Sequence, residues 1–296
     1  MPVGGKPLVG RILAWLHASG IRDVILNLHH HAESITRIVG TGEQYGLRVR
    51  YSWENPILGS AGGPRRAFSL VDTDELLVVN GDTMTDPDVG ALVRTHRASD
   101  ALATLAVIPQ PHVERYGGVL VDDEDRYRGP AGRGEGWHFV GLQVVRRAAF
   151  EDLADGAAAA TIGGVYDRLA ASRPGSVRVC RTQASFLDVG TPTTYLEASV
   201  SLGGGVSAGD RCRVASSSQL NRCVLWDDVV VEEDVTLTDC IVCDRVTVPR
   251  TSRYHRVVLL RAGDAPRGPY DRIEQGLHVA PLGDGGGGGD TGAGPG

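Results

Sequence analysis

The feature that most constrains the fold is a six-residue repeat in the last third of the chain. A six-residue period is typical of a hexapeptide β-helix, in which each face of a coil buries one small apolar residue. An ordinary β-meander, the alternative, would alternate with a period of two. We therefore expect a short β-helix of about two or three coils over 206–250. The longest series comprises Val206, Cys212, Ser218, Val224, Val230, Thr236, Val242 and Val248.

The residues before this repeat alternate helical and strand patterns, which is typical of βα units and a mainly parallel sheet. Apolar residues at Leu8, Ile12 and Leu16 predict a helix that Gly20 ends as a C-cap. Pro64 suits the first turn of another helix, and Asp86 with Pro87 predicts the start of a third. Strands are predicted over 23–28, 49–53, 76–79, 101–108, 119–122, 139–145, 177–181 and 185–187, and helices over 32–39, 64–70, 162–169 and 191–202.

Four regions follow from these patterns. Residues 1–202 form the α/β domain and residues 206–250 the β-helix. Residues 251–282 lose the regularity, so we expect an irregular C-terminal extension. Residues 283–296 are nearly all Gly, Asp, Thr, Ala and Pro. Such a Gly-rich tail cannot bury apolar surface and should be disordered.

Charge and hydropathy exclude several classes of function. The formal net charge is -6 and the basic residues are scattered, so the chain lacks the basic face of a nucleic-acid binder. No apolar run approaches the ~20 residues of a membrane span. The segment Met1–Lys6 has no apolar core of a signal peptide, so we expect a cytoplasmic protein.

The five cysteines do not suggest a disulfide framework, because their number is odd and a secretory signal is missing. Cys240 and Cys243 form a C-x-x-C pattern. A zinc or redox site would need a second ligand pair or a helix N-terminus beside them. Buried small residues of the repeat are the better interpretation.

Two acidic motifs carry the strongest functional signal. Asp82 ends Asn80-Gly81-Asp82, directly after the apolar run 76–79, and Asp188 follows Phe186-Leu187. In an open α/β sheet, ligands bind beyond the carboxyl ends of the strands. Two carboxylates that meet there could hold a hard divalent cation against phosphate oxygens. The alternatives are a local turn at Asp82 and a helix cap at Asp188.

Three glycine motifs could bring backbone close to a ligand. The segment 58–64 precedes a predicted helix, so its N–H groups could contact a nucleotide. A sugar could lie against the backbone of 116–119, and Gly141 sits inside a predicted strand, where glycine often marks a close approach. A plain loop and a tight turn are equally good interpretations of the first two motifs.

Other catalytic patterns find no support. Residues 29–31 are three consecutive histidines, but neighbouring residues at a strand end point in different directions, so they do not converge on a metal. A Walker-type P-loop does not occur in the sequence.

Taken in order, the motifs resemble the sugar-1-phosphate nucleotidyltransferases, also called NDP-sugar pyrophosphorylases. The most similar branch is the mannose-1-phosphate guanylyltransferase type. Each motif is weak alone, whereas their order and spacing over roughly residues 1–250 are more specific. The motifs are Pro2-Val3-Gly4-Gly5-Lys6-Pro7-Leu8, Gly20-Ile21-Arg22-Asp23-Val24, Leu58-Gly59-Ser60-Ala61-Gly62, Val79-Asn80-Gly81-Asp82 and Asp188-Val189-Gly190-Thr191-Pro192.

The resemblance implies a Rossmann-like nucleotidyltransferase domain followed by a short left-handed β-helix. It also implies an enzyme that joins a nucleoside triphosphate to a sugar 1-phosphate, releases pyrophosphate and uses Mg²⁺. Matched position by position, Asp82 and Asp188 are the catalytic, metal-binding carboxylates, and Thr191 lies beside them. Gly59, Ser60, Ala61 and Gly62 contact the nucleotide, and Gly118 and Gly141 line the sugar pocket.

The sequence departs from the family at two places. Family members carry a strand and a G-x-G-T-R…Pro-Lys-Pro signature ahead of the segment that matches 2–8, and this sequence starts after it. Lys6 matches a later lysine and receives no catalytic role. A Glu-Lys-Pro before the strand at Phe139 is also missing, and residues 129–138 are Gly-rich instead. A start codon assigned too far downstream is the favoured explanation; real loss of the loop is the alternative.

Three further alternatives remain at this stage. The chain could be a non-catalytic regulatory subunit that binds a nucleotide sugar without turnover. The guanine and mannose specificity could instead be uridylyl or thymidylyl transfer. The β-helix could also join copies of the chain into a homo-oligomer.

Overall fold

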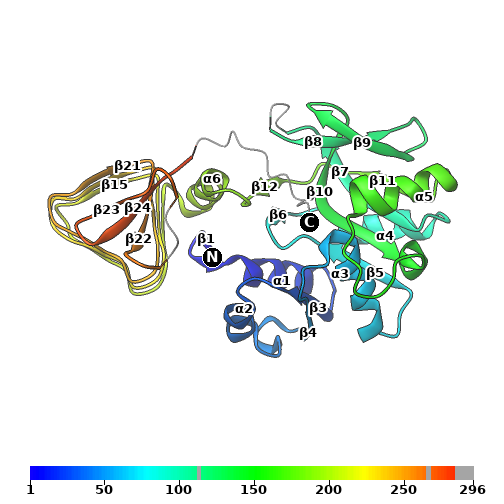
Figure 1. The fold of residues 1–296 in the computed structure, drawn as a ribbon, viewed down its shortest axis with the longest axis horizontal. Coiled ribbons are helices and arrows are strands. Elements are labelled where there is room, and N and C mark those ends of the chain that lie inside the picture. Colours follow the sequence, from blue (N-terminus) through cyan, green and yellow to red (C-terminus); the bar gives the residue numbers. More distant parts are fainter. Residues whose placement is uncertain (112–114, 265–267, 284–296) are drawn as a thin grey trace. The chain divides into compact units, whose positions relative to one another are not determined.

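The computed structural model describes residues 1–111, 115–264 and 268–283. Two compact units divide the chain (Figure 1): Val9–Phe186 is one, and Met1–Leu8 with Leu187–Gly296 is the other. The predicted disordered tail lies, from residue 284 onward, outside the described residues.

The main sheet of the unit Val9–Phe186 is mixed, not mainly parallel as predicted. β11 and β7 run parallel, whereas β10 is antiparallel to β5, β7 and β8, and β8 is antiparallel to β9. The prediction failed because β10 is apolar on both faces and therefore reads like a central parallel strand. The strands are β11 (Val177–Arg181), β7 (Ala103–Pro109), β10 (Trp137–Arg146), β8 (Gly117–Val121), β9 (Tyr127–Arg133) and β5 (Glu75–Val79).

Helices pack on both faces of the strands. Val89 and Leu92 of α4 pack with Val140 and Leu142 of β10 on one face. Tyr166 of α5 belongs to the cluster on the other face. A parallel pair, β3 and β4, carries a third cluster under α1 and α2. The elements are α1 (Leu8–Ala18), β3 (Asp23–Leu28), α2 (Ala32–Val39), η1 (Glu43–Tyr45), β4 (Arg48–Trp53), η2 (Phe68–Leu70), β6 (Thr83–Thr85), α4 (Val89–Arg97), η3 (Arg147–Phe150), η4 (Thr161–Val165) and α5 (Tyr166–Ser172).

Two helix starts differ from the prediction. α3 (Gly59–Ala67) begins before Pro64, because the N–H groups of Leu58 and Ala61 find acceptors outside the helix, at Glu54 Oε2 and the Ala159 carbonyl. The cap of α4 is Asp88, whose Oδ1 accepts from the Ala91 N–H at 2.9 Å.

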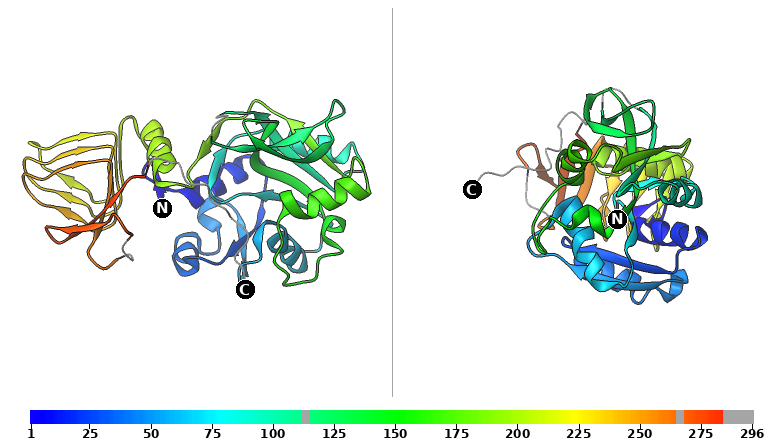
Figure 2. Two further views of the ribbon diagram at one scale, coloured as in Figure 1. Left: turned by 45° about the horizontal axis from the view of Figure 1, so that its top comes forward. Right: turned by 90° about the vertical axis from the view of Figure 1, so that its right-hand side faces the viewer.

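The unit that holds Leu187–Gly296 contains a stack of short parallel strands. Along the chain the strands fall into three sheets in turn, and each strand pairs with the one 17 residues later: Ser207 with Val224, Val230 with Thr247, and Leu220 with Leu237. Figure 2 shows these layered strands in yellow and orange. The strands are β13 (Val206–Ala208), β14 (Arg213–Val214), β15 (Gln219–Asn221), β16 (Cys223–Leu225), β17 (Val230–Val231), β18 (Thr236–Thr238), β19 (Ile241–Val242) and β20 (Thr247–Val248).

Only part of the strict six-residue series faces the interior: Val242 and Val248 lie in the core cluster, whereas other members do not. Val206, its first member, is 37% exposed, and Thr236 is only half-buried. The buried positions advance by six, six and five residues, so they fit a turn of 17. They include Cys223, Val229, Val235, Cys240 and Val246, each at most 1% exposed.

The prediction of an irregular extension over 251–282 is wrong. β21 and β22 continue the parallel sheets, and β24 and β23 add two antiparallel strands at the edge. Tyr254 and Leu259 fill the interior there. Tyr254 lies six residues after Val248, and Leu259 lies five residues after Tyr254, so a strict six-residue count fails only at the second step. The elements are β21 (Arg253–His255), β22 (Val257–Arg261), β23 (Arg272–Glu274) and β24 (Leu277–Pro281), besides β1 (Pro2–Val3), β2 (Lys6–Pro7), β12 (Phe186–Asp188) and α6 (Pro192–Gly203).

Candidate functional site

Asp82 lies on an exposed turn at the carboxyl end of β5. The apolar residues of β5 pair with β10 up to Val79, opposite Leu142. The next N–H, of Asn80, donates to the Gly141 carbonyl at 2.8 Å, and this bond ends the ladder. The chain then turns through Gly81 and Asp82 into β6. The sheet thus presents a carboxylate at a strand end, as the sequence predicts.

Gly141 packs against the same turn. Its φ is +80°, a backbone conformation that favours glycine. A Cβ at this position would lie 2.9 Å from the Cβ of Asn80 and 2.9 Å from the Oγ1 of Thr83. The register of β10 against β7 also shifts between Phe139 and Gln143, which marks a bulge. Gly141, predicted to line the sugar pocket, therefore packs against Asn80 and Thr83 of the turn that carries Asp82, the predicted metal ligand.

Thr83 is a candidate site residue that the sequence analysis missed. Its Oγ1 is buried, and within the described residues it has no hydrogen-bond partner. A buried hydroxyl without a partner costs free energy, so such groups often serve a ligand. Its place directly after Asp82 was the available signal, but its contact with Gly141 depends on β10 and is invisible locally.

The predicted nucleotide segment is the first turn of α3, not a loop. Gly59 and Ser60 are exposed at the helix start, whereas Ala61 is fully buried. A Cβ on Gly62 would lie 2.5 Å from the Ala157 carbonyl oxygen, so glycine is required there for packing. The segment is also fixed by Ser60, whose Oγ accepts from the Thr161 N–H at 2.9 Å. The exposed helix N-terminus suits an anionic group.

Gly118 is explained by backbone packing. A Cβ at this position would lie 2.2 Å from the Glu135 carbonyl oxygen and 3.0 Å from that of Trp137. The close approach of the chain leading into β10 therefore demands glycine, whatever binds there.

An aromatic cluster beside Gly118 was also missed. The ring centroids of Tyr116 and His138 are 4.9 Å apart, and those of His138 and Phe186 are 4.3 Å apart. His138 is only 6% exposed. Tyr116 belongs to the predicted motif 116–119 and Phe186 lies just before the second acidic motif, but only the fold brings their rings together. Flat apolar rings of this kind can pack against a sugar or a base.

Asp188 and Thr191 lie in the other unit, at the end of β12 and the start of α6. Asp188 Oδ1 accepts from the Gly190 N–H at 2.8 Å. The helix cap is Thr191, which exchanges hydrogen bonds with Thr194 in a capping box. The alternative interpretation of Asp188 as the cap of α6 is therefore wrong.

The carboxylates at 82 and 188 offer the hard oxygen donors that Mg²⁺ prefers. Within the described residues, no three His, Cys, Asp or Glu side chains gather as a metal cage. Among those same residues, no helix has the length and apolar character needed to cross a membrane.

The chain is similar to several known proteins. Residues 1–203 match the family model described as Nucleotidyl transferase. A UTP–glucose-1-phosphate uridylyltransferase of Synechocystis is 32% identical over 139 residues, which are 43% of this chain and 36% of that protein. A mannose-1-phosphate guanylyltransferase of Mycobacterium tuberculosis is 25% identical over 224 residues, which are 74% of this chain and 62% of that protein. The chain thus spans less than two thirds of either relative.

A solved structure supports the fold. HddC from Yersinia pseudotuberculosis, complexed with GMP-PN, superposes with a TM-score of 0.60 at 23% sequence identity. The superposition covers 68% of this chain and 88% of that one. At this identity the match shows the α/β fold alone.

Proposed function

The chain belongs to the nucleotidyl transferase family, and we propose that it transfers a nucleotidyl group from a nucleoside triphosphate to a sugar 1-phosphate. The observation that supports the proposal is the turn at the end of β5, where Asp82 is exposed and the next residue, Thr83, places a buried hydroxyl against Gly141. Curated relatives with this activity for glucose and mannose 1-phosphates support it.

In the proposed reaction, an oxygen of the sugar 1-phosphate attacks the α-phosphorus of the triphosphate. The bond between the α-phosphorus and the bridging oxygen breaks, and pyrophosphate leaves with that electron pair. Such transfers need positioning and charge neutralisation more than covalent catalysis. The protein's task is therefore to hold two anionic reactants in line.

We assign these tasks to the residues of the site. Asp82 and Asp188 would hold Mg²⁺, which neutralises phosphate charge when bound. Gly59 and Ser60 would direct N–H groups at the start of α3 toward the nucleotide, while Ala61 and Gly62 hold the helix in place. Gly118 and Gly141 would line the sugar pocket, and Thr191 would orient the segment that carries Asp188.

We propose guanylyl transfer to mannose 1-phosphate as the specific reaction, with uridylyl or thymidylyl transfer as the alternative. The matched guanylyltransferase covers the larger share of this chain. The test is release of pyrophosphate from GTP, UTP, dTTP, ATP and CTP, each with mannose or glucose 1-phosphate and Mg²⁺. Turnover with one pair fixes the substrates. Binding of a nucleotide sugar without pyrophosphate release from any pair would contradict transfer and favour a regulatory subunit.

We also propose that the three parallel sheets form a left-handed β-helix through which a cytoplasmic homo-oligomer assembles. The stacked strands with a 17-residue repeat support the helix. Light scattering of the full chain measures the assembly, and a monomer at all concentrations would contradict it.

A further inference from the structure

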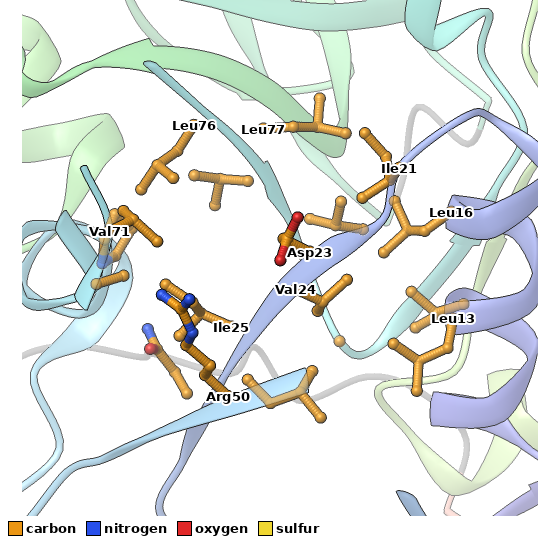
Figure 3. Close-up of a pocket in the computed structure, with 18 of the residues that line it drawn as sticks. Leu13, Leu16, Ile21, Asp23, Val24, Ile25, Arg50, Val71, Leu76 and Leu77 are labelled. Atoms are coloured by element: carbon orange, nitrogen blue, oxygen red, sulfur yellow. The ribbon is translucent and has the colours of Figure 1, made fainter. Parts of the chain in front are cut away.

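Thiols are reactive side chains that the candidate site does not use. All five cysteines are free, and four of them lie in the stack of parallel strands over 206–261, which we term the strand stack. The apolar cavity of about 530 Å³ between β3 and β5, shown in Figure 3, has no thiol among the described residues that line it. The strand stack therefore holds most of the thiols of the chain.

Cys223 and Cys240 occupy equivalent positions in consecutive turns of the strand stack. They are 17 residues apart, which is the spacing of the paired strands, and the residues that follow them pair as Val224 with Ile241. The Val224 N–H donates to the Cys240 carbonyl at 2.9 Å. Neighbouring strands lie ~4.8 Å apart. This spacing falls within the range of about 4.4–6.8 Å that the Cα atoms of a disulfide span.

The two cysteine side chains also point the same way. Both are 0% exposed and belong to one core cluster. Cys223 Sγ lies 3.2 Å from the Asn221 carbonyl oxygen, and Cys240 Sγ lies 3.2 Å from the Thr238 carbonyl oxygen. Asn221 and Thr238 are themselves paired in adjacent strands. The two thiols therefore have equivalent surroundings one turn apart, which stacks one above the other.

The stacked thiols interact with each other. A hydrogen bond between the two side chains lowers the pKa of Cys223 and raises that of Cys240. A thiolate is the nucleophile in thiol chemistry, so the thiol with the lower pKa attacks first. Cys223 is thus the attacking residue of the pair, and Cys240 is the residue that resolves the product.

The C-x-x-C pattern, in contrast, does not bring two thiols together. Cys240 lies in the core cluster, whereas Cys243 follows the end of β19 and lies outside that cluster. Three residues of extended chain separate their Cα atoms by roughly 10 Å, which is beyond the reach of a disulfide. One turn before and after Cys243 lie Trp226 and Leu260, so a second thiol does not stack on it.

We propose that Cys223 and Cys240 are a redox modification site, at which a peroxide converts the stacked thiols into a disulfide that joins two turns of the strand stack. The Cys223 sulfur attacks one peroxide oxygen, the O–O bond breaks, and water leaves, which gives a sulfenic acid. The Cys240 sulfur then attacks the Cys223 sulfur, and the hydroxyl leaves as a second water with the Cys240 proton. The two thiols together lose two electrons, and hydrogen peroxide is reduced to two waters.

This disulfide should be easy to reduce. Stacked side chains start with their Cβ atoms about one strand spacing apart, ~4.8 Å, whereas the Cβ atoms of a relaxed disulfide lie ~3.8 Å apart. Closing that difference strains the bond, and strained disulfides are more reducible. Dithiothreitol should therefore restore both thiols.

A surface ion pair joins the same two turns. Arg222 and Asp239 directly precede the two cysteines, and Arg222 Nε donates to Asp239 Oδ1 at 2.7 Å. Ion pairs on the surface add little stability. Local opening beside this pair is therefore the route by which a molecule as small as hydrogen peroxide reaches the buried thiols.

The experiment maps disulfides in the full chain after treatment with hydrogen peroxide. Remaining thiols are blocked with iodoacetamide in denaturant, and the unreduced chain is cut with trypsin and Glu-C, which cleave after Arg222, Glu233 and Arg245. We expect the fragments 223–233 and 234–245 to be joined, with Cys243 alkylated, and to separate after dithiothreitol. Alkylated Cys223 and Cys240 after peroxide, or a bond to Cys243 instead, would overturn the proposal.

Amide hydrogen exchange tests whether the bond restrains the strand stack. Peroxide should slow exchange over 223–225 and 240–242 by about tenfold or more, because the cross-link limits local opening. Exchange over 103–109, in the other unit, should not change. Unchanged exchange in the cross-linked chain would overturn the restraint.

Two variants complete the test. Cys240→Ala should lose both the cross-link and the slower exchange, whereas Cys243→Ala, the matched control, should keep both. If circular dichroism shows that Cys240→Ala is unfolded, Cys240→Val, of similar size, replaces it. Equal slowing of exchange by peroxide in the folded Cys240 variant would contradict the assignment. Each of these readouts is independent of nucleotidyl transfer.

Discussion

Asn80 and Gly141 are held together at the end of β5, where the Asn80 N–H donates to the Gly141 carbonyl at 2.8 Å. The side chains of Asn80 and Thr83 leave no room for a Cβ at 141. The pair joins a strand end to the middle of its antiparallel neighbour. It therefore fixes the start of the turn that contains Gly81 and Asp82.

Gly141→Ala should lower both stability and turnover. Alanine at a φ of +80° costs about 1–2 kcal/mol, and its methyl group would also push Asn80 and Thr83 apart. Urea unfolding and pyrophosphate release measure the two effects. Gly81→Ala is the matched control, because nothing lies within 4 Å of a Cβ there and its φ is not positive. Equal behaviour of the two variants would contradict the role of Gly141.

Asp82→Asn and Asp188→Asn should each lower turnover by about a hundredfold or more, since a group that stabilises transition-state charge is worth that much. Stability should change by less than about 0.5 kcal/mol for Asp82, an exposed residue. Asp188→Asn keeps an oxygen for the Gly190 N–H. The assay is Mg²⁺-dependent pyrophosphate release, with the exposed Asp72→Asn as control. Full activity in Asp82→Asn would contradict the assignment of Asp82 as a metal ligand.

Elements with a local cause were predicted well. β3 and α2 begin and end where the sequence places them, at 23–28 and 32–39, because their apolar patterns and the glycine after α2 act within one element. The start of α3 was predicted wrongly, because its first turn depends on two acceptors outside the helix. One is the Ala159 carbonyl, far along the chain, and the other is Glu54, across a turn. A prediction from local pattern cannot see such acceptors.

The residues of the candidate site also fall into those that a local pattern predicts and those that it does not. Asp82 was found because a carboxylate follows an apolar run, which is a local pattern. Thr83 and the ring cluster around His138 were not, because their surroundings come from β10 and from residue 186.

Tyr166→Phe should cost about 1–3 kcal/mol, because it leaves a buried acceptor without its donor. The Tyr166 hydroxyl donates to Gln143 Oε1 at 2.6 Å, and both residues are buried. Burial raises the pKa of Tyr166, so the donor keeps its proton at ordinary pH. Urea unfolding measures the loss, and Tyr270→Phe, at an 81% exposed site, is the control.

A second change tests the mechanism of that loss. Adding Gln143→Leu to Tyr166→Phe removes the buried amide that has lost its hydrogen-bond donor, so part of the lost stability should return. A double variant that is less stable than the sum of the two single changes predicts would contradict the hydrogen-bond explanation.

His96 should make the unfolding free energy fall in mildly acidic solution. The side chain is fully buried, and its Nδ1 lies 2.8 Å from Thr104 Oγ1. Burial lowers the pKa of His96 in the folded state, although Glu75 opposes the shift. An unfolded histidine takes up a proton below about pH 6.5, which the folded state resists. Stability from this group is therefore complete above that pH and is lost as the pH falls toward the folded pKa.

The check is urea unfolding of the parent chain and of His96→Gln between pH 8 and 5. Glutamine cannot take up the proton, so the decline in unfolding free energy below about pH 6.5 should become shallower, whatever the variant's stability at pH 8. The exposed His30→Gln serves as the control and should keep the parent slope. Carboxylates also contribute to acid unfolding, but they are the same in all three proteins, so a difference in slope reports the histidine. Identical slopes in the parent and His96→Gln would mean that burial of His96 does not couple protonation to unfolding.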